Sequence, residues 1–458
     1  MGAEFYSALP ANPPADLKLI IDNRELRKQI GLTDKDLKKI QSYCLNPNAN
    51  DFDTFAMVYA GHQFGQFVNQ LGDGRGIFLG QTNHDYDLHL KGAGKTPYSR
   101  FGDGRAVLRS SIREYIASEV MNNLNIPSTR AVALFKSDEK VLRDFYEPSA
   151  VLLRSSQSHI RFGHFEFFHY RNKSKQVKKL ADYVIENYSL FDESAEEPYV
   201  NFFQTIVQKT AQMISKWQGV GFCHGVMNTD NFSILGETFD YGPYAFMESL
   251  NPEFICNTSD YEGRYRYSNQ PYIGLWNCSA LGEALKTLIP EAKIEEILKT
   301  YEQEFSSNLR KIYLDKLGLT EHQPGDDELI QDYLSLINNE NLDYTQSFRS
   351  LVKIIQEEDL IKGSDSLEKW KKRFLKRHEF EKSDLKDRLD MMKSINPHIT
   401  PKNFQIQKVI DAVEKGNYEA LHSFCDAFKS PFEENSKTQV FDEVPGENEA
   451  NIRTSCSS

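Results

Sequence analysis

Residues 221–243 constrain the chain most, because they combine a dense set of polar side chains with two short β-prone runs. The runs 232–235 and 238–240 are separated by Gly-Glu, which is the spacing of a two-residue hairpin. A hairpin that turns there places Asn231 and Asp240 at the same end, as neighbours across the ladder. An amide oxygen beside a carboxylate suits Mg²⁺ or Mn²⁺, whose other ligands would be water and phosphate.

The same stretch has the residue order of a protein-kinase catalytic site. Kinases carry His-Arg-Asp, four further residues, Asn, a hairpin and then Asp-Phe-Gly. Here His224 and Asn231 keep that interval, and Asp240-Tyr-Gly takes the place of Asp-Phe-Gly. The kinase base position is Val226, which cannot accept a proton, so Asp230 is the one carboxylate in this loop. Asn and Asp also favour turns, and for either residue alone that alternative stays open.

A strand and a helix upstream supply a second candidate pair. Residues 87–91 alternate polar and apolar side chains, which predicts a strand with one buried face and Lys91 on the other. The helix that follows has an apolar stripe of Leu108, Ile112, Ile116 and Val120, with Glu114 on another face. Kinases pair a strand lysine with a helix glutamate, so Glu114 is the candidate partner of Lys91. The alternatives are a solvated edge lysine and a solvated helix glutamate.

Two Gly-Asp-Gly-Arg segments and two later arginines are candidates for binding phosphate. Closely spaced glycines beside a strand let backbone N–H groups approach phosphate, although Gly-Asp-Gly is also an ordinary turn. Arg75 adds a cation to the first segment, ahead of a strand predicted over residues 77–79. Arg154 and Arg161 lie on one loop after a short apolar strand, where they would clamp a polyphosphate. As surface arginines they would have no such role.

Composition excludes several classes of protein. The net charge of −12 and the pI near 5.5 argue against a nucleic-acid or anionic-membrane partner. No apolar run reaches spanning length and the N-terminus lacks a signal peptide, so the expected location is the cytoplasm. The six cysteines show no Cys-x-x-Cys spacing, which argues against a zinc site or a dense disulfide framework. We expect a monomer.

The length of 458 residues suggests two or three lobes. Residues 1–50 begin with a proline-rich entry and a charged amphipathic segment, typical of a wrapping arm. Residues 51–195 and 196–330 are expected to form the two lobes that share the site. Residues 331–458 are expected to be a helical extension, which loses its periodicity and becomes an extended tail after Ser430.

With these residues assembled, the sequence resembles the selenoprotein O (SelO) family, a branch of kinase-fold proteins. The resemblance is dense between about residues 50 and 290 and rests on motifs in family order: Gly-His-Gln-Phe-Gly, Leu-Gly-Asp-Gly-Arg-Gly, Leu-Lys-Gly-Ala-Gly, Thr-Pro-Tyr-Ser-Arg, Arg-Ala-Val-Leu-Arg-Ser-Ser-Ile-Arg-Glu, His-Gly-Val-Met-Asn-Thr-Asp-Asn and Asp-Tyr-Gly-Pro. The family implies transfer of AMP from ATP to Ser, Thr or Tyr hydroxyls of other proteins. It also implies that ATP is held in the opposite orientation to that in a kinase, so that the α-phosphate faces the acceptor.

The resemblance implies a role for each candidate residue. Lys91 and Arg154 would hold the outer phosphates, and Glu114 would orient Lys91. Asp230 would accept the proton of the incoming hydroxyl. The metal ion, Mg²⁺ or Mn²⁺, would be held by Asn231 and Asp240, and the residues lining the nucleotide would be Gly72, Gly74, Arg75, Asp103, Gly104 and Arg161.

The tail resembles that of the family as well. The sequence ends in Thr-Ser-Cys-Ser-Ser, with Cys456 where some members place selenocysteine. The resemblance implies a bond from this cysteine to Cys256, in the loop after Asp-Tyr-Gly, and therefore a redox latch. A frayed tail with a free thiol is the alternative.

We therefore predict an α+β protein with a two-lobed, protein-kinase-like fold and a helical C-terminal extension, acting as a metal-dependent protein adenylyltransferase. Uridylyl transfer from UTP stays open, because no residue is seen to read the base. Kinase-type phosphotransfer would require Asp230 to replace the missing base. A nucleotide-binding pseudokinase scaffold is disfavoured, because binding alone does not require a metal pair beside Lys91 and Glu114.

Overall fold

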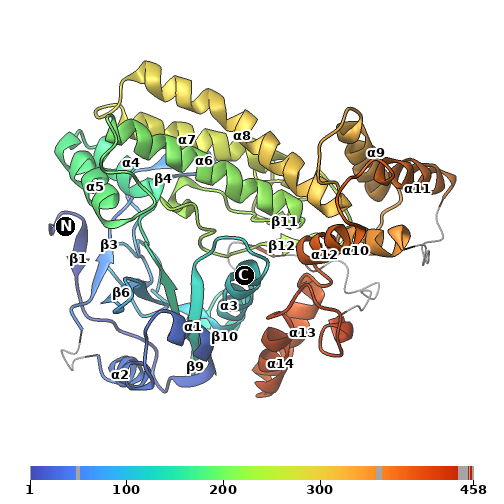
Figure 1. Cartoon of the computed structure of the whole chain (residues 1–458). Coiled ribbons are helices and arrows are strands. Elements are labelled where there is room, and N and C mark those ends of the chain that lie inside the picture. Colours follow the sequence, from blue (N-terminus) through green and yellow to red (C-terminus); the bar gives the residue numbers. More distant parts are fainter. Residues whose placement is uncertain (1, 48–51, 357–363, 442–451, 453, 456–458) are drawn as a thin grey trace.

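A computed structural model of the chain describes residues 2–47, 52–356, 364–441, 452, 454 and 455. An antiparallel sheet forms its first part, and the later part is helical (Figure 1). The strands of this sheet are β1 (Tyr6–Ala8), β2 (Lys18–Asp22), β3 (Phe55–Met57), β6 (Gly76–Gln81), β7 (Asp87–Lys91), β8 (Ala106–Val107), β9 (Arg130–Leu142) and β10 (Tyr146–Ser156). The mixed α and β class is thus confirmed.

The strand order is β1-β3-β6-β7-β10-β9-β2, with β8 paired to β10. The N-terminal segment supplies both outermost strands, β1 and β2, so it reaches across the whole sheet. Two small sheets stand apart from it: β4 (Gly61–Gln63) pairs with β5 (Gln66–Val68), and β11 (Phe222–Cys223) pairs with β12 (Ala245–Phe246).

The helix predicted from the stripe Leu108 to Val120 and the helical C-terminal region are both present. The helices are α1 (Arg24–Gln29), α2 (Asp34–Leu45), α3 (Leu108–Asn123), α4 (Phe162–His169), α5 (Ser174–Asn187), α6 (Pro198–Gly219), α7 (Gln270–Leu285), α8 (Glu291–Leu317), α9 (Asp326–Asn339), α10 (Tyr344–Ile355), α11 (Asp365–His378), α12 (Leu385–Ile395), α13 (Asn403–Glu414) and α14 (Glu419–Ala427). Among the described residues, no helix is both long enough and apolar enough to cross a membrane.

Helix α3 links the sheet to the rest of the core. Its four stripe residues, Leu108 to Val120, are at most 2% exposed and belong to the largest buried apolar cluster. Burial of one such side chain contributes about 1.5–3 kcal/mol. The helix packs against β9 and β10, which orients its Glu114 relative to β7.

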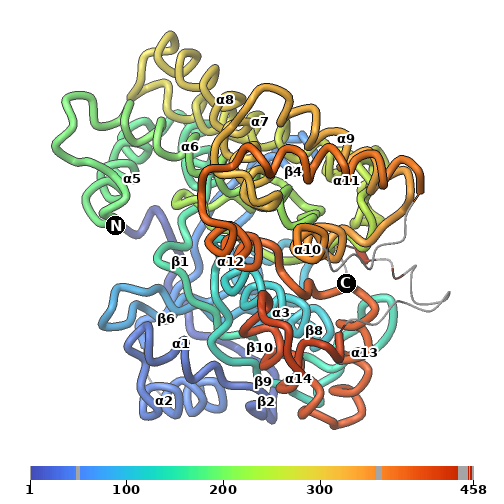
Figure 2. The backbone as a smooth tube through the Cα atoms, turned by 45° about the vertical axis from the view of Figure 1, so that its right-hand side comes forward, coloured from blue at the N-terminus to red at the C-terminus, as the bar shows by residue number. Residues whose placement is uncertain are grey.

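The C-terminal helices return to the sheet region. Figure 2 shows α13 and α14 beside α3. Asn123 Nδ2 donates to the Phe428 carbonyl over 2.9 Å. After Ser430 we expected an extended tail, but Phe441 packs its ring on Phe424 and Phe428. Residues 430–441 are therefore folded back, because α14 offers them an apolar face.

The prediction that strand 87–91 has one buried face is wrong. Strand β7 lies between β6 and β10, and its polar residues are buried as well: Asp87 is 4% and His89 1% exposed. The polar face is covered because Asp87 Oδ2 accepts the backbone N–H of His159 over 3.0 Å. The alternating pattern therefore did not reveal that the polar face of β7 is buried as well.

The predicted two-residue hairpin is also wrong in its details. A single antiparallel bridge joins Phe232 to Thr238, and the turn falls earlier, with Gly236 N–H donating to the Ser233 carbonyl over 3.3 Å. The runs do not form a regular ladder, because Ser233 pairs with Arg161 and Thr238 pairs with Ser128. Asn231 and Asp240 nevertheless line the same cavity.

Candidate active site

One cavity of about 750 Å³, which we call the central cavity, lies between the sheet and the loop that follows β11. It brings together residues that are far apart in the sequence. The predicted site residues in its lining are Gly72, Gly74, Arg75, Lys91, Asp103, Gly104, Arg154, Arg161, Asp230, Asn231 and Asp240. Glu114 lies behind Lys91, and Cys256 lies outside the lining.

Asp240 is the point on which three cations converge. Its Oδ1 lies 2.5 Å from Arg154 Nη1 and 3.3 Å from Lys91 Nζ, and its Oδ2 lies 2.7 Å from Arg161 Nη1. Burial opposes the charged form, but the three cations hold the pKa of Asp240 well below its usual range. Asp240 also has a φ of +55°, a left-handed conformation that is uncommon for non-glycine residues, although Asp adopts it more readily than most.

Lys91 and Glu114 form the ion pair that the kinase comparison predicted. Lys91 Nζ donates to Glu114 Oε2 over 2.5 Å, and Arg154 Nη1 donates to Glu114 Oε1 over 3.1 Å. Burial lowers the pKa of Lys91, while Glu114 and Asp240 act in the opposite direction. Lys91 ends a strand in the interior of the sheet, so the alternative of a solvated edge lysine is excluded.

Arg161 is held between two aromatic rings. Its guanidinium lies 4.6 Å from the ring centre of Tyr59 and 4.2 Å from that of Phe239. It also donates to the backbone carbonyl of Asp230 over 2.8 Å. His224, the histidine of the kinase-like order, donates from Nε2 to the Phe239 carbonyl over 3.0 Å and so fixes the backbone before Asp240.

Asp230 is the candidate proton acceptor, and it is 7% exposed. Burial raises its pKa to about 7. Gln63 Nε2 donates to its Oδ2 over 3.2 Å, and within the described residues Oδ1 has no hydrogen-bond partner. Sequence reasoning missed Gln63, although it lies in the Gly-His-Gln-Phe-Gly motif. No local pattern connects it to Asp230.

The donor set fits a hard divalent cation. Asn231 Nδ2 donates to the Val226 carbonyl over 3.0 Å, which leaves its Oδ1 for a ligand, and Asp240 faces the same cavity. Over the described ranges, no group of three or more His, Cys, Asp or Glu side chains is arranged to hold a metal. A metal ion here would therefore take most of its ligands from phosphate and water, as Mg²⁺ commonly does.

The glycine segments surround the cavity mouth. Gly72 has a φ of +143°, and a Cβ on it would lie 2.5 Å from the Tyr98 ring. Gly104 has a φ of +73°, and a Cβ on it would lie 2.2 Å from the Gly94 backbone. Asp103 is paired with Arg143 at 2.7 Å, so its carboxylate already has a cation partner.

The cysteine predicted to form a latch is buried beside a second thiol. Cys256 Sγ lies 3.4 Å from Cys223 Sγ. The end of the chain is bound at this place, because Thr454 Oγ1 donates to the Cys256 carbonyl over 2.7 Å and Thr258 N–H donates to the Thr454 carbonyl over 2.9 Å. Cys456 lies outside the described residues.

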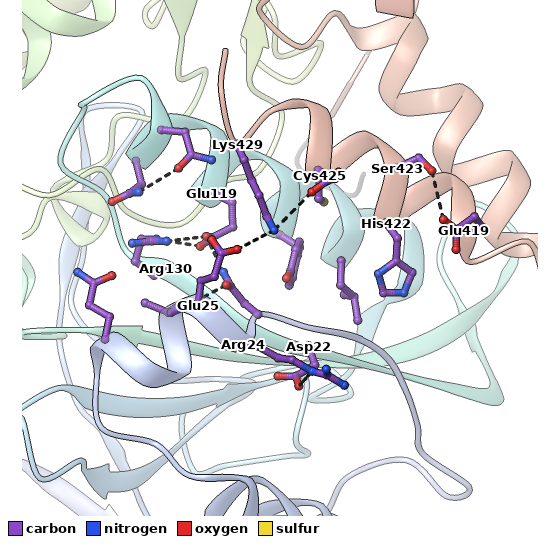
Figure 3. A pocket seen from close by; sticks show the side chains of 18 residues that line it. Asp22, Arg24, Glu25, Glu119, Arg130, Glu419, His422, Ser423, Cys425 and Lys429 are labelled. Atoms are coloured by element: carbon purple, nitrogen blue, oxygen red, sulfur yellow. Dashed lines mark hydrogen bonds and ion pairs between the residues drawn. The ribbon is translucent and has the colours of Figure 1, made fainter. Parts of the chain in front are cut away.

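A second cavity, of about 570 Å³, lies between the N-terminal segment, α3 and α14; we call it the α14 cavity (Figure 3). Its charged side chains pair with one another. Arg130 donates to both oxygens of Glu119 over 2.9 and 2.7 Å. Lys429 lies 3.0 Å from Glu25. This cavity contains none of the predicted site residues.

Buried cations that converge on one carboxylate beside glycine-rich backbone are typical of enzymes that bind a polyphosphate. Comparisons with known proteins agree with this class. The chain is 40% identical over 468 residues to "Protein nucleotidyltransferase YdiU" of Vibrio atlanticus (strain LGP32), covering 99% of the chain and 96% of the relative. The protein of the same name from Pseudomonas entomophila (strain L48) is 40% identical over 474 residues, covering 100% of the chain and 97% of the relative.

These relatives identify the protein as an enzyme of the nucleotidyltransferase class. The model of one family, described as "Protein adenylyltransferase SelO", matches residues 1–429. The chain belongs to the SelO family, and the resemblance seen in its motifs is confirmed.

Proposed function

We propose that this protein transfers AMP from ATP to Ser, Thr or Tyr hydroxyls of protein substrates and releases pyrophosphate. The observation that carries the proposal is the convergence of Lys91, Arg154 and Arg161 on Asp240 in the central cavity. Three fixed cations suit a leaving group that carries as much negative charge as pyrophosphate. Membership of the SelO family supports the choice of the adenylyl group.

We also propose a two-lobed, protein-kinase-like arrangement around the cavity. Residues 51–195 would form the lobe that supplies the glycine segments, Lys91 and Glu114. Residues 196–330 would form the lobe with the catalytic loop, between the wrapping arm 1–50 and the helical extension 331–458. The Lys91–Glu114 pair and the order His224, Asn231, Asp240 support this assignment.

In this mechanism the chain's own residues bind, orient and accept a proton. Lys91 and Arg154 hold the outer phosphates, and Glu114 keeps both cations in place through its two oxygens. Asp230 takes the proton of the acceptor hydroxyl while the hydroxyl oxygen attacks the α-phosphorus and pyrophosphate departs. Asn231 and Asp240 would hold Mg²⁺ or Mn²⁺, which supplies charge stabilisation to the phosphates.

The kinase base position supports adenylyl transfer over phosphotransfer. Val226 lines the central cavity, where its side chain offers no proton acceptor. Asp230 lies in the same lining, and its carboxylate accepts a hydrogen bond from Gln63. Recognition of ATP over UTP and the cytoplasmic location stay predictions from the sequence.

We further propose that Cys256 and Cys456 form a regulatory disulfide. Thr454 is bonded to the backbone of Cys256, and two residues of extended chain reach about 7 Å at most. Two-electron oxidation by a low-molecular-weight disulfide would join the two sulfurs and release two thiols of the oxidant. Cys456→Ser should then abolish a mobility difference between reduced and oxidised gels, and a difference that persists would exclude this pairing.

Labelling ATP in parallel at the α- and γ-phosphates tests the transfer reaction. The full chain is incubated with Mg²⁺ or Mn²⁺, and products are read by autoradiography and intact mass. Label from the α-position alone, with a gain of one AMP, is the expected result. Label from the γ-position would contradict the proposal and indicate phosphotransfer. Nucleotide that binds without any transfer of label would indicate a non-catalytic scaffold. Parallel α-labelled UTP distinguishes uridylyl transfer.

A further inference from the structure

A buried chain of three side chains connects the first glycine segment to Arg154. Arg154 Nε donates to His89 Nδ1 over 3.2 Å, and His89 Nε2 lies 3.6 Å from Asp73 Oδ1. Asp73 is the middle residue of the Gly-Asp-Gly segment, and its Oδ2 accepts the Met57 N–H over 2.9 Å. The three side chains belong to residues that are 4%, 1% and 4% exposed. None of these contacts was predicted from the sequence.

We propose that His89 is a positioning residue for nucleotide binding, which holds the Arg154 guanidinium toward the central cavity and ties it to the glycine segment. The proposal rests on the proposed function only in that Arg154 is taken to bind the outer phosphates. His89 itself acts through Arg154 and Asp73.

The hydrogen bond from Arg154 fixes the protonation of the imidazole. An arginine Nε–H can only donate, so His89 Nδ1 must carry a lone pair and the proton of the neutral ring is on Nε2. Nε2 and Asp73 Oδ1 are 3.6 Å apart, too far for a hydrogen bond, so their contact is electrostatic. Burial, together with the charge of Arg154, lowers the pKa of His89 to about 3. The ring is therefore a neutral acceptor at physiological pH. A protonated ring would place a second cation against Arg154.

Packing fixes the orientation of the ring. A Cβ on residue 76 would lie 2.3 Å from His89 Cε1, so the ring occupies the space that Gly76 leaves open. On another side the ring stacks on His159, with ring centres 5.0 Å apart and an interplanar angle of 20°. His159 is anchored in turn, because its Nδ1 lies 3.3 Å from Asp87 Oδ2. The imidazole has little freedom to turn away from Arg154.

The bond to His89 differs from the other polar contacts of Arg154. Arg154 Nη1 contacts Glu114 and Asp240, two carboxylates of the proposed site. His89 also lines the central cavity but is only 1% exposed, and its neutral acceptor does not compete with phosphate for the charge of the guanidinium. It can therefore keep Arg154 in place whatever the two carboxylates contact.

Equilibrium binding of ATP and of AMP to the full chain tests the role. Loss of one hydrogen bond to a charged group costs about 1.5–3 kcal/mol, so His89→Leu should weaken ATP binding about tenfold or more. AMP lacks the outer phosphates, and its affinity should stay within about twofold. His89→Gln keeps an acceptor for Arg154, so its ATP affinity should stay within about threefold of the wild type.

Two controls separate positioning from general damage to the core. His159→Phe removes an equally buried imidazole but keeps a ring to stack on His89, and should change ATP affinity by less than about threefold. In an Arg154→Ala background, adding His89→Leu should change ATP affinity by less than about twofold, because the two residues act as a unit. If His89→Leu is not recovered folded, His89→Met supplies the same test with a flexible apolar side chain.

Either of two results would overturn the role: equal losses of ATP and AMP affinity in His89→Leu, or a full additive effect in the Arg154→Ala background. These binding measurements do not require transfer to occur. A negative α-label experiment with the expected ATP and AMP values would therefore reject the proposed reaction while the positioning role stands.

Discussion

The central cavity and the α14 cavity are both polar, and they differ more in how their charges are arranged than in size. In the central cavity, Lys91, Arg154 and Arg161 converge on Asp240, and Glu114 is the second carboxylate of Lys91 and Arg154. In the α14 cavity, Arg130 pairs with Glu119, and Lys429 pairs with Glu25 and Asp426. Buried charge is costly unless it is compensated. A local excess of buried cations therefore predicts an anionic ligand, whereas cations that are matched by carboxylates predict a structural contact between segments.

The largest effect should come from the shared carboxylate. Asp240→Ala removes a proposed metal ligand and the group on which three cations converge, so adenylyl transfer should fall on the order of 10³-fold or more. Transfer of α-labelled AMP, measured with circular dichroism as a check of folding, tests this. Turnover within tenfold of the wild type would contradict the assignment of Asp240 as a metal ligand. Asp426→Ala, beside Lys429, should leave transfer unchanged.

Two lysines provide the next comparison. Lys91→Ala should lower kcat about 10²- to 10³-fold, because a buried cation directed at the phosphates is lost. Lys429→Ala removes a half-exposed lysine of the α14 cavity and should leave kcat unchanged. Steady-state transfer assays on both variants measure the difference. Equal kcat values for Lys91→Ala and Lys429→Ala would show that the arrangement of charges does not identify the active site.

A sharper pair lies on one helix. Glu114 and Glu119 both belong to α3 and are 4% and 9% exposed, but they pair with cations of different cavities. Glu114→Gln should lower kcat about 10- to 100-fold, because Lys91 and Arg154 lose their charged partner. Glu119→Gln weakens the contact to Arg130 and should instead cost about 1–3 kcal/mol of unfolding free energy, with kcat unchanged. Denaturant unfolding and transfer assays should therefore give opposite rankings.

The smallest effect concerns a buried lysine outside both cavities. Lys316 bonds to Asn396 Oδ1 at 3.0 Å, and burial lowers its pKa to about 7. The folded state therefore binds fewer protons than the unfolded state between about pH 7 and the ordinary lysine pKa. Wild-type stability relative to Lys316→Met should rise across that window by about 1.4 kcal/mol per pH unit. Unfolding of both proteins at pH 7 and pH 9 measures it, and parallel pH profiles would contradict it.

Prediction from sequence succeeded where local order carries the information. The stripe from Leu108 to Val120 gave helix α3, and the Lys91–Glu114 pair followed from the kinase comparison. The prediction of a hairpin after Asn231 failed, because its two runs form bridges to Ser128 and Arg161, which lie far away in the sequence. The prediction of one solvated face for β7 failed for a related reason. Periodicity distinguishes polar from apolar residues, but it does not distinguish a solvated face from a buried polar network.

The remaining site residues were beyond sequence reasoning. Gln63 reaches Asp230 from the small β4–β5 sheet, and His89 reaches Arg154 from the neighbouring strand. Each of these contacts joins side chains more than sixty residues apart. Glutamine and histidine in an alternating strand resemble ordinary surface residues until the fold brings their partners to them.

The space between residues 76 and 89 also has a consequence for the history of the sequence. Because the ring of His89 fills the volume that a Cβ on Gly76 would need, the glycine cannot be replaced while the histidine stays in place. A lineage that replaces the glycine must first, or at once, change the side chain at position 89. Related sequences with a side chain at position 76 should therefore carry a residue other than histidine at position 89.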